Sequence, residues 1–262
     1  MNIIQAMTER RSIRSFNGHV LDDDIRTTLS KAADESSDPF GGSVTIRLNN
    51  FDLKNGYRPG TYGMIKGASD FFLIGMKDDE LSALSAGFRF EQVVLKAWQL
   101  GLGCCWIAAT FKGSDFDRGQ QWPDGERLKI ICPVGIPAKP ALLDKLTRAT
   151  FRSSSRKPFD RLFFLDDFNH PVGSDNRFHE ALQMLRLAPS STNSQPWRAL
   201  IADNTVHFYY KPISPLSVID CGIGMCHFHE TEMFYGRRGI FAKHDDAPVP
   251  PDNWRYIMSY TA

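Results

Sequence analysis

The sequence predicts a mixed α+β fold, and three observations support that class. Segments with apolar residues at helical spacing alternate along the chain with strand-like segments, so neither an all-α nor an all-β fold accounts for the pattern. Two nearly continuous apolar runs, at 70–77 and 127–135, are typical of strands buried on both faces of a sheet. The composition, with 42% hydrophobic and 23% charged residues, is that of an ordinary globular protein.

The first half of the chain is expected to contain the strands of a central sheet, with helices before and between them in the sequence. An Asp cap begins the second helix, alternation marks the first strand, and Gly101 ends the longest helix. The expected elements are, in order, helices over 2–10 and 22–35, strands over 43–49 and 70–77, a helix over about 80–100, an extended buried segment over 104–110, and a strand over 127–135.

The second half begins with a basic stretch, 138–162, which holds seven Lys or Arg among twenty-five residues and predicts a surface crossover. Further expected elements are a helix over 178–188 that stops at Pro189, two strands within 197–210 about an Asp-Asn turn, a helix over 216–235 and a strand over 253–261. Segments 29–48 and 182–201 each combine a helix, a polar loop with Pro and a strand, which suggests two half-similar units. Two ordinary helix-loop-strand units explain this similarity equally well.

The charge balance and the N-terminal sequence argue against nucleic-acid-binding, membrane-surface and secreted proteins. Thirty-one Lys and Arg against thirty Asp and Glu leave a net charge of +1, so no global field attracts nucleic acid or a membrane surface. The N-terminus carries charges where a signal peptide needs an apolar core, and we expect a cytoplasmic protein. Five cysteines without an export signal predict reduced thiols.

Two short stretches carry candidate chemistry. In ERRSIRSF, alternate residues Arg10, Ser12 and Arg14 of an extended segment point the same way and suit a phosphate monoester, although a solvated basic turn after a helix explains the pattern better by itself. In APSSTNSQPW (188–197), two prolines enclose amides and hydroxyls able to bind the polar edge of a flat heterocycle. An ordinary capped connector is the alternative interpretation.

Together, these stretches resemble the two most diagnostic segments of the FMN-dependent nitroreductase family. QLGLGCCWIAA (99–109), ICPVGIPA (131–138) and RKPFDRLFF (156–164) follow in the family's order, so the resemblance spans most of residues 1–200. It implies a nitroreductase-like fold with a mixed central sheet flanked by helices. It also implies FMN as cofactor, NAD(P)H as reductant, and a small flat acceptor such as a nitroaromatic compound or a quinone.

The resemblance also assigns site residues. Arg10, Ser12, Arg156 and Lys157 would grip the phosphate, Arg14 would tune the flavin beside its pyrimidine edge, and no protein nucleophile is needed. Ala108 and Ala109 stand where family members often carry an acidic residue and Gly. The cofactor-binding residues implied in this way are Arg10, Arg11, Ser12, Arg14, Trp106, Ile107, Ala108, Ala109, Arg156, Lys157, Pro189, Ser190, Ser191, Asn193 and Gln195.

The order of the segments departs from the family. A typical member has its polar loop soon after the R-x-S-x-R segment, whereas here that position reads ESSDPFGGS (35–43) and the matching loop follows about 150 residues later. The resemblance therefore implies a single-chain, internally duplicated branch. In this branch a nearly complete unit (1–168) and a reduced unit (169–262) share one core and form a pseudo-dimer with one FMN, so the chain would be a monomer.

Other interpretations remain. The chain could instead be a redox-inactive flavin-binding or sensor protein of the same fold, or a flavin- or iodotyrosine-modifying enzyme of the superfamily. Cys221, Cys226, His227 and His229 fit no standard zinc spacing, LGLG (100–103) lacks the flanking elements of a dinucleotide-binding fold, and Arg237 and Arg238 are expected to form a surface pair. Segments 50–68 and 238–253 are expected to select the acceptor.

Overall fold

The computed structural model describes residues 1–51, 59–138, 155–251 and 253–262. Each expected helix and strand is present with bounds within about two residues, apart from the segment 104–110. In that segment only Cys104 belongs to a strand, and Ile107 forms an isolated bridge with Ile131. Residues 139–154, most of the basic crossover, lie outside the described residues. The elements are α1 (Ile3–Glu9), α2 (Asp23–Glu35), β1 (Val44–Asn50), β2 (Asp70–Met76), α3 (Glu80–Gln99), β3 (Gly103–Cys104), α4 (Gly113–Phe116), β4 (Arg127–Gly135), η1 (Phe159–Arg161), β5 (Phe163–Leu165), α6 (His179–Leu187), η2 (Ser191–Asn193), β6 (Trp197–Ala202), β7 (Thr205–Tyr210), α7 (Ser217–Phe234), β8 (Ile240–Ala242) and β9 (Arg255–Thr261).

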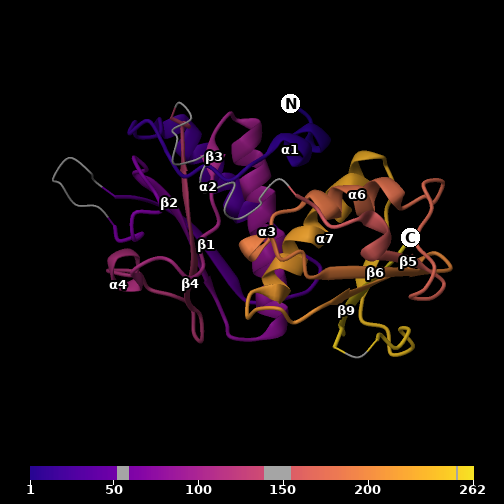
Figure 1. Cartoon of the computed structure of the whole chain (residues 1–262). Coiled ribbons are helices and arrows are strands. Elements are labelled where there is room, and N and C mark those ends of the chain that lie inside the picture. The colour runs from indigo at the N-terminus through magenta and orange to yellow at the C-terminus, as the bar shows by residue number, and fades with distance from the viewer. Residues whose placement is uncertain (52–58, 139–154, 252) are drawn as a thin grey trace.

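The α+β class is confirmed, but the strands form two sheets instead of one central sheet. The first sheet has the order β1-β2-β4-β3 with antiparallel pairs, and the second has the order β5-β6-β7-β9-β8 with one parallel pair, β5 with β6. Figure 1 shows the two sheets on opposite sides of the molecule with α3 and α7 between them. The sheets are separate because each covers one face of this helix pair, so both bury an apolar face against the same helices.

The two halves follow the same topology. In the first half α2, β1, β2, α3 and β4 occur in this order, with β3 and α4 before β4. In the second half α6, β6, β7, α7 and β9 occur in the same order, with η2 before β6 and β8 before β9. Within the sheets, β1-β2-β4 corresponds to β6-β7-β9, with antiparallel pairing throughout. The pairing of the last two strands shifts at a bulge in each half, between Ile74 and Gly75 and between Phe208 and Tyr209. Such bulges are local design features of a sheet, so their matching positions reinforce the similarity.

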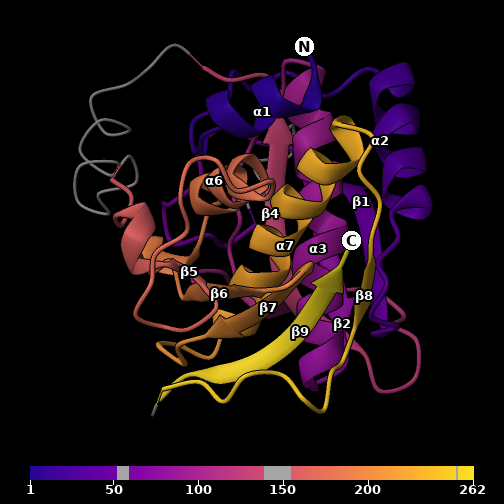
Figure 2. The ribbon, with the colours of Figure 1, turned by 90° about the vertical axis from the view of Figure 1, so that its right-hand side faces the viewer.

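Helices α3 and α7 lie side by side at the centre, and their backbones touch where two glycines meet (Figure 2). A Cβ atom on Gly87 would overlap the carbonyl oxygen of Ile219, and a Cβ atom on Gly222 would overlap the carbonyl oxygen of Leu84. The contact is therefore reciprocal, with each helix presenting a glycine to the other's backbone. Glycine is required at both positions for this close approach.

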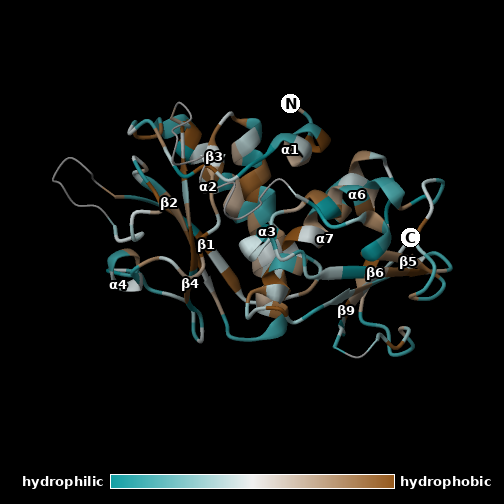
Figure 3. Cartoon of the chain, viewed as in Figure 1, coloured by the Kyte–Doolittle hydropathy of each residue, from teal (hydrophilic) through white to brown (hydrophobic). Residues whose placement is uncertain are grey.

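One hydrophobic core joins the two halves. Buried side chains of the first sheet, such as Phe72 and Ile130, belong to the same cluster as Phe208 and Tyr260 of the second sheet. Figure 3 shows hydrophobic residues on β2, β4 and the central helices, whereas the peripheral loops are mostly hydrophilic. Within the part of the chain that is described, no helix is both long and apolar enough to cross a membrane.

Candidate functional site

A cavity of about 300 Å³ opens between the two halves. All the site residues expected from the sequence line it, except Lys157 and Gln195. The lining comes from seven parts of the chain: Arg10, Arg11, Ser12 and Arg14; Met64; Cys105, Trp106, Ile107, Ala108, Ala109 and Thr110; Ile130; Arg156; Pro189, Ser190, Ser191, Thr192 and Asn193; and Leu216, Ile219, Asp220 and Ile223.

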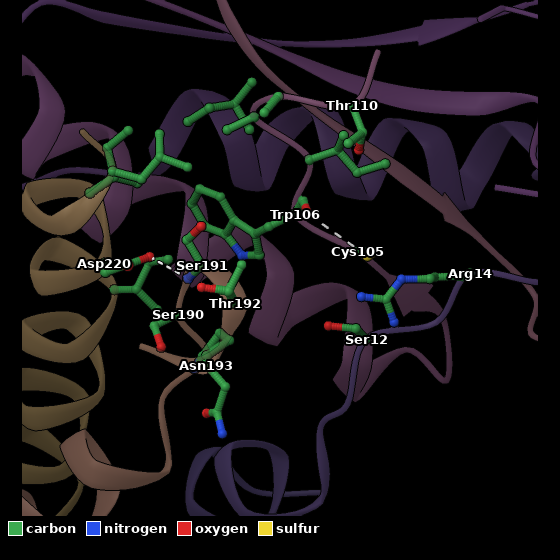
Figure 4. A pocket seen from close by; sticks show the side chains of 18 of the residues that line it. Ser12, Arg14, Cys105, Trp106, Thr110, Ser190, Ser191, Thr192, Asn193 and Asp220 are labelled. Atoms are coloured by element: carbon green, nitrogen blue, oxygen red, sulfur yellow. Dashed lines mark hydrogen bonds between the residues drawn. The ribbon is translucent and has the colours of Figure 1, made fainter. Parts of the chain in front are cut away.

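The N-terminal wall is an extended segment. Helix α1 ends at Glu9, and Arg10 is its extended C-cap residue. The chain then runs beside β3, where Ser12 pairs with Cys104 and the amide of Ile13 donates a 2.9 Å hydrogen bond to the Cys104 carbonyl. This backbone pairing explains why Ser12 and Arg14 share one side of the cavity (Figure 4).

A second cation reaches the cavity from the other half of the chain. Arg156 donates hydrogen bonds to the Leu187 carbonyl (2.9 Å) and to Oδ1 of Asn193 (3.3 Å). Burial lowers the pKa of the Arg156 guanidinium, and the nearby charges of Arg10 and Arg186 lower it further. Arg10 and Arg156 thus bring positive charge to the cavity from the two halves of the chain.

The opposite wall is the loop that contains η2. Its backbone is left-handed at Thr192, Asn193 and Gln195, with φ of 50°, 57° and 47°. Two internal contacts hold this turn, because the Gln195 amide donates to Oγ of Ser190 (2.9 Å) and the Gln195 side chain donates to Asn193. The left-handed backbone turns Ser190, Ser191 and Asn193 towards the cavity.

Asp220 is a cavity residue that the sequence analysis missed. It lies in the first turn of α7 and is 3% exposed. Its carboxylate accepts hydrogen bonds from the Ser191 amide (2.9 Å) and the Ser194 hydroxyl (3.3 Å), which anchors the polar loop. Burial raises the pKa of Asp220 to about 7, although the same two hydrogen bonds lower it. The sequence did offer one indication of its importance, because Asp220 is the acidic residue in the otherwise apolar first turns of α7.

Glu91 of α3 was missed as well, and it organises a buried polar cluster next to the cavity. Its carboxylate accepts a 2.9 Å hydrogen bond from Nε1 of Trp106, lies 3.0 Å from Nε2 of His227 and lies 3.8 Å from Nε of Arg10. Nδ1 of His227 is 3.0 Å from the Met184 carbonyl, so that nitrogen carries a proton. The cluster thus connects α3 and α7 with two cavity residues.

His227 belongs to the segment with Cys221, Cys226 and His229, whose spacing fits no standard zinc site. His227 is engaged with Glu91, and the described residues contain no group of three or more ligating side chains suited to a metal ion. All five cysteines are buried and free.

Two expected site residues lie outside the cavity lining. The Lys157 ammonium donates to the carbonyls of Ser194 and Gln195, and the Lys157 amide donates to the Gln195 side chain (2.8 Å). Lys157 is directed to the loop because the carbonyls that the left-handed turn exposes need donors. Gln195 lies within the loop itself.

Of the two segments expected to select the acceptor, 50–68 and 238–253, the first contributes one described residue to the cavity lining. Met64 of the segment 50–68 lines it, whereas 52–58 lie outside the described residues. No described residue of the segment 238–253 lines it.

A comparison with known protein families gives one match. The model of a protein family described as "Putative TM nitroreductase" matches residues 2–231. No curated protein matches the sequence closely enough to count as a relative.

One solved structure shares the fold over the whole chain, and others are similar to about half of it. A structure described as a putative nitroreductase from Thermotoga maritima is 17% identical, with a TM-score of 0.64, and the match covers 100% of this chain and 94% of that one. A nitroreductase with bound FMN from Desulfitobacterium hafniense is 14% identical with a TM-score of 0.45, over 54% of this chain and 92% of that one. An FMN-dependent nitroreductase from Clostridium difficile is 18% identical with a TM-score of 0.42, over 53% and 89%.

Proposed function

Because the chain belongs to the nitroreductase family whose model matches residues 2–231, we propose that it is an FMN-dependent oxidoreductase. In this proposal, hydride passes from NAD(P)H through the flavin to a flat acceptor such as a nitroaromatic compound or a quinone. The observation that carries the proposal is the convergence of Arg10, Arg14 and Arg156 with the polar loop on one cavity.

The cavity has the size and chemistry of a small-molecule site, which supports the proposal. Its volume of about 300 Å³ lies at the lower end of the range of small-molecule sites, and it combines apolar walls with a few polar groups. Arg10, Arg156 and Ser12 would hold the phosphate, because guanidinium groups bind phosphate through paired, charge-assisted hydrogen bonds. Ser190, Ser191 and Asn193 would hold the ribityl chain and the polar edge of the ring.

When bound, FMN would supply the hydride chemistry of the site. The protein's own contribution would be to orient the ring between the wall of residues 106–110 and the polar loop. Arg14 would place a positive charge beside the pyrimidine edge, where it stabilises negative charge that develops on reduction. The apolar side chains of Ile107, Ile219 and Ile223 would exclude water from the reacting face.

A second candidate function is a flavin-binding or sensor protein without redox turnover. The observation that favours it is the presence of Ala108 and Ala109 on the cavity wall, because neither side chain offers a hydrogen-bonding group to the flavin. The two candidate functions are distinguished by whether NADPH or NADH reduces the bound flavin.

We also propose that the chain is a fused pseudo-dimer, with a nearly complete unit (1–168) and a reduced unit (169–262). The matching strand order, the matching bulges and the reciprocal contact of Gly87 with Gly222 support this division. One FMN per chain and a monomer are then expected, and we place the protein in the cytoplasm. Light scattering combined with flavin absorbance tests this. A dimer, or two flavins per chain, would contradict it.

The functional proposal is tested with purified protein and three variants. We expect the protein to be yellow and to be bleached by NADPH or NADH without oxygen. Arg10→Ala and Arg156→Ala should lose FMN on dilution, whereas Arg127→Ala should retain it, because Arg127 is exposed and pairs with Asp78 at the surface. A yellow protein that reduced nicotinamide cannot bleach supports the sensor function, and a colourless protein that ignores added FMN refutes both.

A further inference from the structure

Three cations gather at the C-terminal end of the polar loop, outside the cavity. Lys157 follows Arg156 in the chain, Arg198 lies in β6, and Lys211 follows β7. Strands β6 and β7 are adjacent and antiparallel, and their register places Trp197 opposite Tyr210, which brings Arg198 close to Lys211. Figure 2 shows these strands beside one another.

Lys157 and Arg198 bind the same backbone oxygen. The Lys157 ammonium lies 3.3 Å from the Gln195 carbonyl oxygen, and Nη1 of Arg198 lies 3.2 Å from that same atom. Two positive charges therefore sit within a few ångströms of each other, separated only by a carbonyl group.

Arg198 and Lys211 share one aromatic ring. The Arg198 guanidinium carbon is 5.3 Å from the centre of the Trp254 ring, and the Lys211 ammonium is also 5.3 Å from it. Trp254 attracts both cations by its π-electrons, but it carries no charge that would neutralise them.

The described residues give these three cations no carboxylate as an ion-pair partner. Arg198 is only 5% exposed, and its buried Nε has no hydrogen-bond partner. Burial, together with repulsion from Arg198 and Lys211, lowers the pKa of Lys157 to about 8, and burial lowers the pKa of Arg198 to about 10. Holding such charges together is unfavourable unless an anion joins them.

We propose that Lys157, Arg198 and Lys211 form a second anion site, which binds a phosphate group. Guanidinium and ammonium donors around a partly exposed cluster suit a tetrahedral dianion, which accepts several charge-assisted hydrogen bonds at once. The site differs from the phosphate clamp of the cavity, because none of its three cations lines that cavity. The phosphate group belongs either to free inorganic phosphate or to a nucleotide, and the experiment distinguishes these sources.

The test uses protein saturated with FMN, so that the cavity clamp is filled, in a buffer of low ionic strength. Calorimetry measures the binding of inorganic phosphate and, separately, of adenosine 2′-monophosphate. The main variant is Lys211→Gln, because this side chain lies over the Trp254 ring, whereas Lys157 and Arg198 donate to carbonyls of the polar loop. Lys243→Gln is the matched control, since Lys243 also lies over an aromatic ring, Tyr256, but is paired with Glu80.

We expect saturable phosphate binding that Lys211→Gln weakens about tenfold or more and that Lys243→Gln leaves unchanged. A clear preference for the adenosine phosphate identifies a nucleotide as the source, and equal binding identifies free phosphate. Absence of saturable binding by either probe overturns the proposal, as does unchanged affinity in both Lys211→Gln and Lys157→Gln. Flavin absorbance, followed in the same samples, reports on the cavity alone, so a failure of the proposed function is recognised separately.

Discussion

The buried carboxylate of Glu91 provides a test of how the two halves are joined at the site. Glu91 and His227 are fully buried, and Glu91 also accepts the Trp106 indole hydrogen bond. The change Glu91→Ala leaves the indole N–H without an acceptor and deprives the imidazole of its partner. Each buried polar group that loses its hydrogen-bond partner costs about 1–3 kcal/mol, so we expect the free energy of unfolding to fall by about 4 kcal/mol for the two groups.

Urea denaturation followed by circular dichroism measures this loss. Glu91→Gln is the matched control, because its amide oxygen still accepts from Trp106 and its NH₂ still reaches His227, and we expect it to lose about half as much. His227→Ala leaves the contact between Glu91 and Arg10 in place, so it should reduce stability without releasing FMN. If Glu91→Ala lowers the free energy of unfolding by less than about 1 kcal/mol, the cluster does not join the two halves as described.

Three further predictions concern stability and reactivity. Asp220 binds its proton up to about pH 7 when folded and up to about pH 4 when unfolded, so the free energy of unfolding should fall by up to about 4 kcal/mol as pH rises between these values. Asp220→Asn should flatten this profile in denaturation series at pH 4 to 8. Gly87→Ala should destabilise the protein by about 1–3 kcal/mol in the same assay, whereas Gly113→Ala, where a Cβ meets nothing, should be neutral. The five buried cysteines should react with an aromatic disulfide reagent only after unfolding, and rapid reaction of the native protein would contradict their burial.

The helices and the longer strands were predictable from the sequence, because their apolar periodicity reflects burial on one or both faces. The division into two sheets was not, because it depends on how α3 and α7 pack. The strands β5 and β8 have three residues each, which is too short for a periodic pattern. The segment 104–110 is apolar enough for a strand, yet its hydrogen bonds to β4 are limited to a few positions.

The candidate site was predictable where a local motif carries it. The segment at residues 10–14 and the polar loop were recognised by residue type and order, and the structure brings them to one cavity. Glu91 and Asp220 escaped recognition because their significance depends on contacts with residues distant in the chain. The contact of the Lys157 side chain with the loop carbonyls was not predictable, because the left-handed backbone at Thr192 and Gln195 determines where carbonyl groups point, and neither residue type signals that conformation.

The cavity combines residues from Arg10 to Ile223, which affects how the protein is made. Contacts between such distant segments close large loops and form late in folding, so a ligand of the cavity binds only to chains that have completed this step. During synthesis, Ile219 and Ile223 leave the ribosome about 200 residues after Arg14, so the cavity cannot be complete until most of the second half has been made.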